Sequence, residues 1–189
     1  MTDALDQRFR TAVALNPVNV ALLARLPALV LPDCWLVAGC LFQAVWNIQC
    51  DRAPGDGVND YDVFYFDDTD LSYEAEDRVI RRVLAATADL GATIEVKNQA
   101  RVHLWYAQRF GAGYPQLRSA KDGIDRFLVA GTCVGIGASL SNGADLYAPY
   151  GLADIFDGIL RPNAHNLVGD RYAAKAESYR TRWPHLRVM

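Results

Sequence analysis

The sequence has little of what a zinc site or a nucleic-acid-binding surface requires. It holds only three histidines, which lie far apart, and none of its four cysteines forms a Cys-x-x-Cys pair. A structural zinc site is therefore not expected. The 22 Asp and Glu residues outnumber the 19 Lys and Arg residues, and the net charge is −3. Because proteins that bind duplex DNA usually carry a basic excess, strong duplex-DNA binding is not expected either.

Long hydrophobic runs are also lacking. The longest apolar stretch, residues 27–42, is interrupted by Pro32 and Asp33 and is too short to span a membrane. The first ten residues include acidic side chains and contain no apolar run of signal-peptide length. We therefore predict a cytoplasmic protein with reduced thiols and no membrane partner.

The composition is that of a globular protein. Hydrophobic residues make up 51% of the 189 residues and charged residues 22%, which suits one domain with a substantial core. No linker divides the chain, so residues 1–189 are expected to form a single domain. A subdomain over about residues 115–189 stays open as an alternative.

Helical periodicity, caps and turn residues predict a mixture of helices and strands. Helices are expected at residues 3–14, 16–26, 41–50, 73–90, 98–110, and near 151–159 and 170–182. Strands are expected at 60–66, 92–97 and 132–139, and the Asn142-Gly143 pair predicts a hairpin turn. Residues 34–40 fit either a buried strand or the start of a helix. This order predicts an α+β (mixed α/β) domain, with one small mixed sheet and helices packed against it.

Two aspartates open the strand expected at residues 60–66. Because side chains alternate along a strand, Asp60 and Asp62 should lie on one face, about 7 Å apart at their Cα atoms. Two carboxylates so placed can bind one hard cation between them or serve two adjacent ones. The plain alternative is a polar strand end with both aspartates solvated.

Two further features would complete a site. Glu95 lies in the next expected strand and would add a third carboxylate if that strand pairs beside the first. Gly39-Cys40 lies where a strand passes into a helix, and a glycine there lets the backbone approach a phosphate. Taken alone, each feature also fits an ordinary role, Glu95 on a half-exposed strand and Gly39 in a tight packing turn.

In this order, the three features resemble the polymerase-β-type nucleotidyltransferase superfamily. Its members have a Gly-Ser or Gly-Gly turn before a helix, an Asp-x-Asp strand, and a third acid on a later strand. The blocks "AGCLFQAVWN", "NDYDVFYFD", "EVKNQARVHLWY" and "APYGLADIFDGILRPN" resemble a bacterial nucleotidyltransferase-like family of unassigned substrate. The resemblance extends from about residue 16 to 184.

The resemblance implies a Mg²⁺-dependent (or Mn²⁺-dependent) transfer of a nucleoside monophosphate from a nucleoside triphosphate to an unknown acceptor, a small molecule, RNA or protein. Asp60 and Asp62 would bind the ion that contacts the phosphates, and Glu95 would help bind a second one. Gly39 and the backbone amides after it, Cys40 included, would position the triphosphate.

Two basic residues near the third acid extend the expected nucleotide site. Lys97 and Arg101 could neutralise phosphate charge, although a surface ion pair would explain them as well. Cys40 stands where the superfamily has Ser or Gly, so a hydroxyl contact to phosphate is lost. This departure keeps a second hypothesis open, a catalytically silent domain that binds a nucleotide or a protein.

Overall fold

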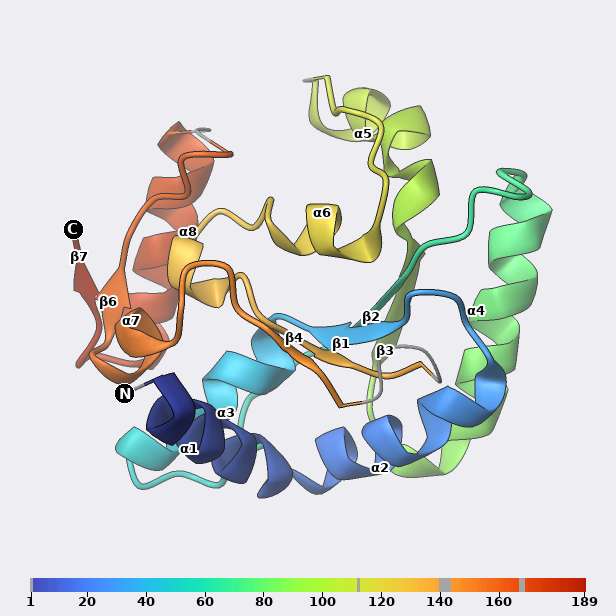
Figure 1. The fold of residues 1–189 in the computed structure, drawn as a ribbon. Helices are drawn as coiled ribbons and strands as arrows, with labels where there is room; N and C mark the ends of the chain where they lie inside the picture. The colour runs from blue at the N-terminus through green and yellow to red at the C-terminus, as the bar shows by residue number, and fades with distance from the viewer. Residues whose placement is uncertain (1, 112, 140–143, 167–168) are drawn as a thin grey trace.

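The computed structural model describes residues 2–111, 113–139, 144–166 and 169–189, and the expected Asn142-Gly143 turn lies outside them. These residues form seven strands and eight α-helices (Figure 1). The α-helices are α1 (Thr2–Ala14), α2 (Pro17–Arg25), α3 (Gly39–Gln49), α4 (Tyr73–Thr87), α5 (Val102–Phe110), α6 (Ala120–Ile124), α7 (Ala153–Phe156) and α8 (Gly169–Arg182). The strands are β1 (Trp35–Val37), β2 (Tyr61–Tyr65), β3 (Ile94–Asn98), β4 (Gly135–Gly137), β5 (Leu146–Tyr147), β6 (Ile159–Leu160) and β7 (Arg187–Val188).

One five-stranded sheet forms the centre, in the order β3-β2-β1-β4-β5. Strands β2 and β3 are parallel because α4 carries the chain back between them, and the other neighbours are antiparallel. Strands β6 and β7 form a separate parallel pair. The predicted α+β class with a small mixed sheet is confirmed.

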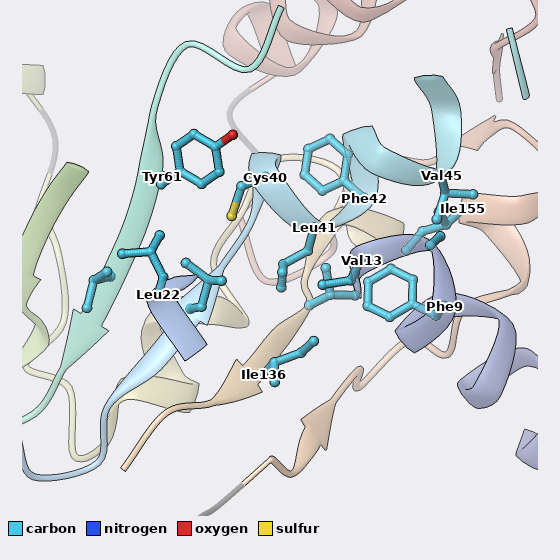
Figure 2. Packing of buried hydrophobic residues seen from close by; sticks show 14 of the residues in the cluster. Phe9, Val13, Leu22, Cys40, Leu41, Phe42, Val45, Tyr61, Ile136 and Ile155 are labelled. Carbon is cyan, nitrogen blue, oxygen red and sulfur yellow. The ribbon is translucent and has the colours of Figure 1, made fainter. Parts of the chain in front are cut away.

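The two faces of the central sheet bury different side chains. On one face, Tyr61, Val63 and Tyr65 of β2 join the main core with side chains of α1, α2 and α3. Figure 2 shows part of this core, in which Tyr61 lies near Cys40 of α3. On the other face, Phe64 packs in a smaller cluster with Ile124 of α6. Asp62 shares the face of Phe64, as the alternation predicts.

Residues 34–40, for which periodicity left two interpretations open, contain both elements. Strand β1 ends at Val37 and α3 begins at Gly39. The cap expected at Asn98 forms as well, but Asn98 ends β3 and its side chain accepts a hydrogen bond from the backbone of Ala100. A 3₁₀ turn, η3 (Gln99–Arg101), therefore separates β3 from α5, which the helical pattern alone did not predict.

Two C-terminal predictions need correction. The β-rich run 132–139 forms only the three residues of β4, preceded by the 3₁₀ turn η4 (Ala130–Thr132). The helix expected near 151–159 is limited to α7, and Gly158, with a φ of +65°, starts a passage into β6. A residue with positive φ ends a helix readily when it is glycine.

The last third of the chain contributes to the central sheet and to the main core. Strands β4 and β5 belong to the five-stranded sheet. Tyr179 and Trp183 of the α8 region pack on Trp46 of α3, with both ring centroids 5.2 Å from that of Trp46. The domain boundaries themselves stay a prediction. In the described residues no single helix is long and apolar enough to cross a membrane. One pair of consecutive helical segments, Ala4–Ala14 and Pro17–Leu29, has the required length and composition when taken together, but the two segments are bent by 98° at their junction.

Candidate active site

A cleft of about 510 Å³ opens on the sheet face that carries Asp62. Strands β2 and β3 contribute to its lining, together with the start of α3, the η3–α5 segment, the residues after α6, and α8. The lining includes the three predicted carboxylates, Asp60, Asp62 and Glu95, and also Gly39 and Lys97. Five of the seven residues predicted for the site therefore line one cleft.

The strand register brings two of the carboxylates together. Asp62 and Glu95 are direct partners across the parallel β2–β3 pair, so their side chains leave the same face. Asp60 lies just before β2 and lines the same cleft. The sequence predicted the alternation within each strand, whereas the register between the strands comes only from the tertiary structure.

Lys97 provides the positive charge between these carboxylates. Its Nζ atom lies 2.6 Å from Glu95 Oε2 and 3.9 Å from Asp62 Oδ1. Lys97 follows Glu95 by two residues on β3 and so points to the same face. Among the described residues, no group of three His, Cys, Asp or Glu side chains is arranged to hold one metal ion.

The carboxyl group of Asp62 has a pKa well above its usual value. Burial raises the pKa of Asp62 to about 6, opposed by the nearby Lys97 ammonium and reinforced by the charges of Asp60 and Glu95. A cation bound beside such a carboxyl group favours its ionisation, because the cation stabilises the charged form. The cleft floor is therefore a place where added positive charge is favourable.

The start of α3 borders the cleft beside these acids. Ala38 precedes the helix with φ 60° and ψ −128°, a conformation that costs an L-residue backbone strain. A Cβ atom on Gly39 would come within 2.6 Å of Gln43 Nε2, so the glycine keeps the first turn open. The first amides of a helix have no intrahelical partner and suit an anion.

Cys40 is not among the residues that line the cleft. Its side chain is fully buried in the core (Figure 2). The thiol donates to Val37 O at 3.4 Å, and burial raises the thiol pKa well above its usual range. A side-chain contact between Cys40 and a phosphate is therefore not available in this arrangement.

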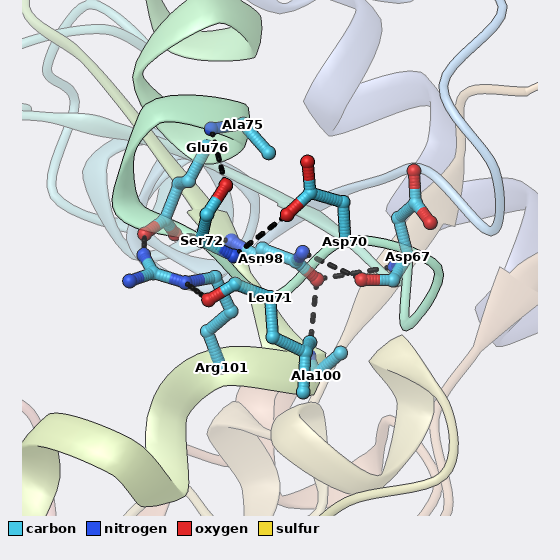
Figure 3. A network of polar contacts seen from close by, with 9 residues as sticks. All are labelled: Asp67, Asp70, Leu71, Ser72, Ala75, Glu76, Asn98, Ala100 and Arg101. Atoms are coloured by element: carbon cyan, nitrogen blue, oxygen red, sulfur yellow. Dashed lines mark hydrogen bonds and ion pairs between the residues drawn. The ribbon is translucent and has the colours of Figure 1, made fainter.

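Arg101 lies outside the cleft lining, contrary to its expected place beside a phosphate. The Arg101 guanidinium forms an ion pair with Glu76 and donates to Leu71 O at 2.9 Å (Figure 3). The physical reason is η3, which turns residue 101 away from the face of Glu95 and Lys97 and toward α4. Arg101 is only 8% exposed there.

Several cleft residues were not identified from the sequence. Arg126 follows α6, and Arg171 and Lys175 lie four residues apart on α8, the spacing of one helical face. With Lys97 and Arg109 they give the described lining five cations against three carboxylates. The i, i+4 spacing was a usable signal for the α8 pair. Nothing in the sequence indicated that α8 would face the acid strands.

Comparison with known proteins indicates the family and the fold of the chain. A family model described as nucleotidyltransferase matches residues 24–188. A solved NMR structure described as a CCA-adding enzyme head domain is 26% identical with a TM-score of 0.74, and the match covers 97% of this chain and 95% of that one.

Two larger solved structures share the fold. A CCA-adding enzyme in complex with CTP is 10% identical with a TM-score of 0.59, over 97% of this chain and 43% of that one. A tRNA-processing enzyme in an apo form is 14% identical with a TM-score of 0.52, over 82% of this chain and 39% of that one. No curated protein matched the chain significantly.

Proposed function

Because the chain belongs to the nucleotidyltransferase family, we propose that its cleft transfers a nucleoside monophosphate from a nucleoside triphosphate to an acceptor hydroxyl. The observation that carries this proposal is the direct pairing of Asp62 with Glu95 at the floor of a cleft bordered by the first turn of α3. This chemistry requires acids and a turn that can bind phosphate to face the same space, and the proposal is supported by Asp62, Glu95 and Gly39 lining one cleft.

The carboxylate set fits Mg²⁺ or Mn²⁺, because hard divalent cations prefer oxygen ligands. Asp60, Asp62 and Glu95 would hold the metal, and in the structure the Lys97 ammonium lies against two of them. When bound, the metal would neutralise phosphate charge and lower the pKa of the acceptor hydroxyl.

The other cleft residues would bind and orient the triphosphate. The first amides of α3 at Gly39 and Cys40 offer N–H donors, and Arg171 and Lys175 on α8 add positive charge to the same cleft. The acceptor oxygen would bond to the α-phosphorus while the bond from that phosphorus to the bridging oxygen breaks. Pyrophosphate then leaves, and the five cations of the lining offset its charge.

The donor is best supported as a nucleoside triphosphate, since a protein of the same fold is known in complex with CTP. For the acceptor we keep three classes, a small molecule, RNA or protein. A labelled-transfer experiment separates them by the fraction of a cell extract that becomes labelled.

A second function is favoured by a specific observation. Lys97 contacts Glu95 and Asp62, and Cys40 lacks the hydroxyl of its superfamily counterparts. A domain in which Lys97 permanently satisfies the carboxylates would bind a nucleotide or a protein partner without turnover.

The test is incubation with Mg²⁺ or Mn²⁺ and each α-labelled triphosphate, following pyrophosphate release and label transfer. We expect Asp62→Ala and Glu95→Ala to lower the rate by at least about a hundredfold, because each removes a direct metal ligand. Asp68→Ala, at an exposed position after β2, is the matched control and should retain the rate. Equal rates in all variants would exclude catalysis at this site, and nucleotide binding without turnover would support the silent domain.

A further inference from the structure

Two donor atoms of cleft side chains, Gln99 Nε2 and Arg126 Nε, are buried without a hydrogen-bond acceptor among the described residues. Gln99 is 2% exposed, and its Nε2 atom has no partner among the described residues. Arg126 Nε is likewise buried and unpartnered in the described part of the chain. Both residues line the cleft. An unsatisfied buried donor is costly, so each of these groups favours a ligand that brings an acceptor.

The backbone around Gly123 accounts for the position of Gln99. A Cβ atom on Gly123 would meet Gln99 Cδ at 2.8 Å and collide with Gln99 Oε1, so only glycine leaves room for the carboxamide. The oxygen of Gln99 is therefore packed against Gly123. Arg126 lies three residues after Gly123, and its backbone N–H donates to Gly123 O at 3.2 Å. The two unpartnered donors thus belong to one connected structure.

Aromatic rings adjoin Arg126. The Arg126 guanidinium carbon lies 4.8 Å from the centroid of the Tyr114 ring, and the Tyr114 centroid lies 4.3 Å from that of Tyr106. Both tyrosines line the cleft with Gln99 and Arg126. Aromatic faces and guanidinium planes can stack on a nucleobase with little regard to its identity. Hydrogen bonds to the edge of the base must then supply the discrimination.

We propose that Gln99 and Arg126 read the base of the donor nucleotide and select a base edge that presents hydrogen-bond acceptors. This inference rests on the proposed function. Cytosine offers the neighbouring acceptors O2 and N3, and guanine offers O6 and N7, whereas in uracil the N3–H donor lies between O2 and O4. Adenine places its N6 amino donor beside N1 and beside N7, so one of the two protein donors would face another donor. ATP is therefore the disfavoured donor, and Gln99 and Arg126 are specificity-determining residues.

The experiment measures the dissociation constants of ATP, CTP, GTP and UTP by calorimetry on the full chain with Mg²⁺. Wild type should bind ATP at least about tenfold more weakly than the tightest of the other three, because a buried donor stays unpaired. Gln99→Glu replaces the donor with an acceptor and should shift the preference toward ATP. Gln99→Met, which removes the donor at similar volume, should abolish the discrimination, and circular dichroism verifies that both variants fold.

Arg109→Met is the matched control, since it removes a cleft cation. It should weaken all four nucleotides alike. Four equal dissociation constants in wild type, or an order unchanged in both Gln99 variants, would overturn the base-reading assignment and leave the proposed function intact. Failure of every triphosphate to bind would overturn both.

Discussion

At the residue scale, Asp62 couples the cleft to the stability of the fold. Its carboxyl group is held where ionisation is unfavourable, so the folded protein binds a proton there at a pH at which the unfolded chain has released it. Because the folded pKa of about 6 exceeds the unfolded value of 3.8, the stability that protonation contributes is complete below about pH 4 and is lost as pH rises through 6.

The corresponding prediction concerns Asp62→Asn in metal-free buffer. Relative to wild type, the variant should gain about 2 kcal/mol in free energy of unfolding at pH 8, because the burial of a charge is removed. The gain should disappear at pH 4, where wild type is already protonated. Urea denaturation across this range measures it, with Asp68→Asn, at an exposed position, as control. A gain independent of pH would contradict the assignment.

At the element scale, β3 serves the cleft with one face and the core with the other. Glu95 and Lys97 point into the cleft, whereas Ile94 and Val96 pack in the main core. The turn η3 then changes the direction of the chain and ties the end of β3 to α4. Glu76 of α4 accepts from Asn98 N at 2.8 Å and pairs with Arg101.

This connection predicts a structural role for Arg101. Arg101→Met should lower the free energy of unfolding by about 3 kcal/mol, because it leaves the Glu76 carboxylate, whose side chain is only 12% exposed, without its cation. The dissociation constant of the tightest triphosphate should stay within about twofold of wild type, since Arg101 is outside the cleft lining. Arg78→Met is the control: its ion pair is exposed and should contribute less than about 1 kcal/mol.

Replacing both buried partners separates the ion pair from packing. Arg101→Met combined with Glu76→Met should recover part of the loss, because no uncompensated charge is then buried. A large loss of nucleotide affinity in Arg101→Met, with the fold intact, would restore the phosphate-binding role predicted from the sequence.

At the scale of the whole molecule, the C-terminal region is joined to the main core through aromatic side chains. Trp183 is fully buried, and its indole Nε1 donates to Asn47 Oδ1 of α3 at 2.8 Å. The acidic chain also gathers five cations in one cleft. A negative net charge over the whole sequence therefore does not describe the local charge of the cleft.

If the chain unfolds as one cooperative domain, Trp183→Ala should lower its stability without dividing the unfolding transition. The variant should lose about 3–5 kcal/mol of unfolding free energy, because a large core side chain and a hydrogen bond are removed. Tryptophan fluorescence and far-ultraviolet circular dichroism should still report one shared transition in urea. Leu104→Ala, at a half-exposed position, is the control and should change stability by less than about 0.5 kcal/mol. A separate early transition would instead support an independent subdomain over residues 115–189.

Much of the fold and part of the site could be predicted because local patterns suffice for them. Asn16 caps α2 and Ser72 caps α4 because their side chains accept hydrogen bonds from amides of the first turn. The alternation along β2 placed Asp62 opposite the core residues. The family-level resemblance to nucleotidyltransferases is confirmed, and the roles of the site residues stay predictions.

The sequence by itself determined which side chains share a strand face and where most helices begin, because both follow from a fixed repeat and from contacts within a few residues. Only the tertiary structure decided that Asp62 meets Glu95, that Arg101 turns to Glu76, and that Gln99 and Arg126 line the cleft. Those relations depend on strand register and on packing between segments far apart in the chain, and no local pattern encodes them.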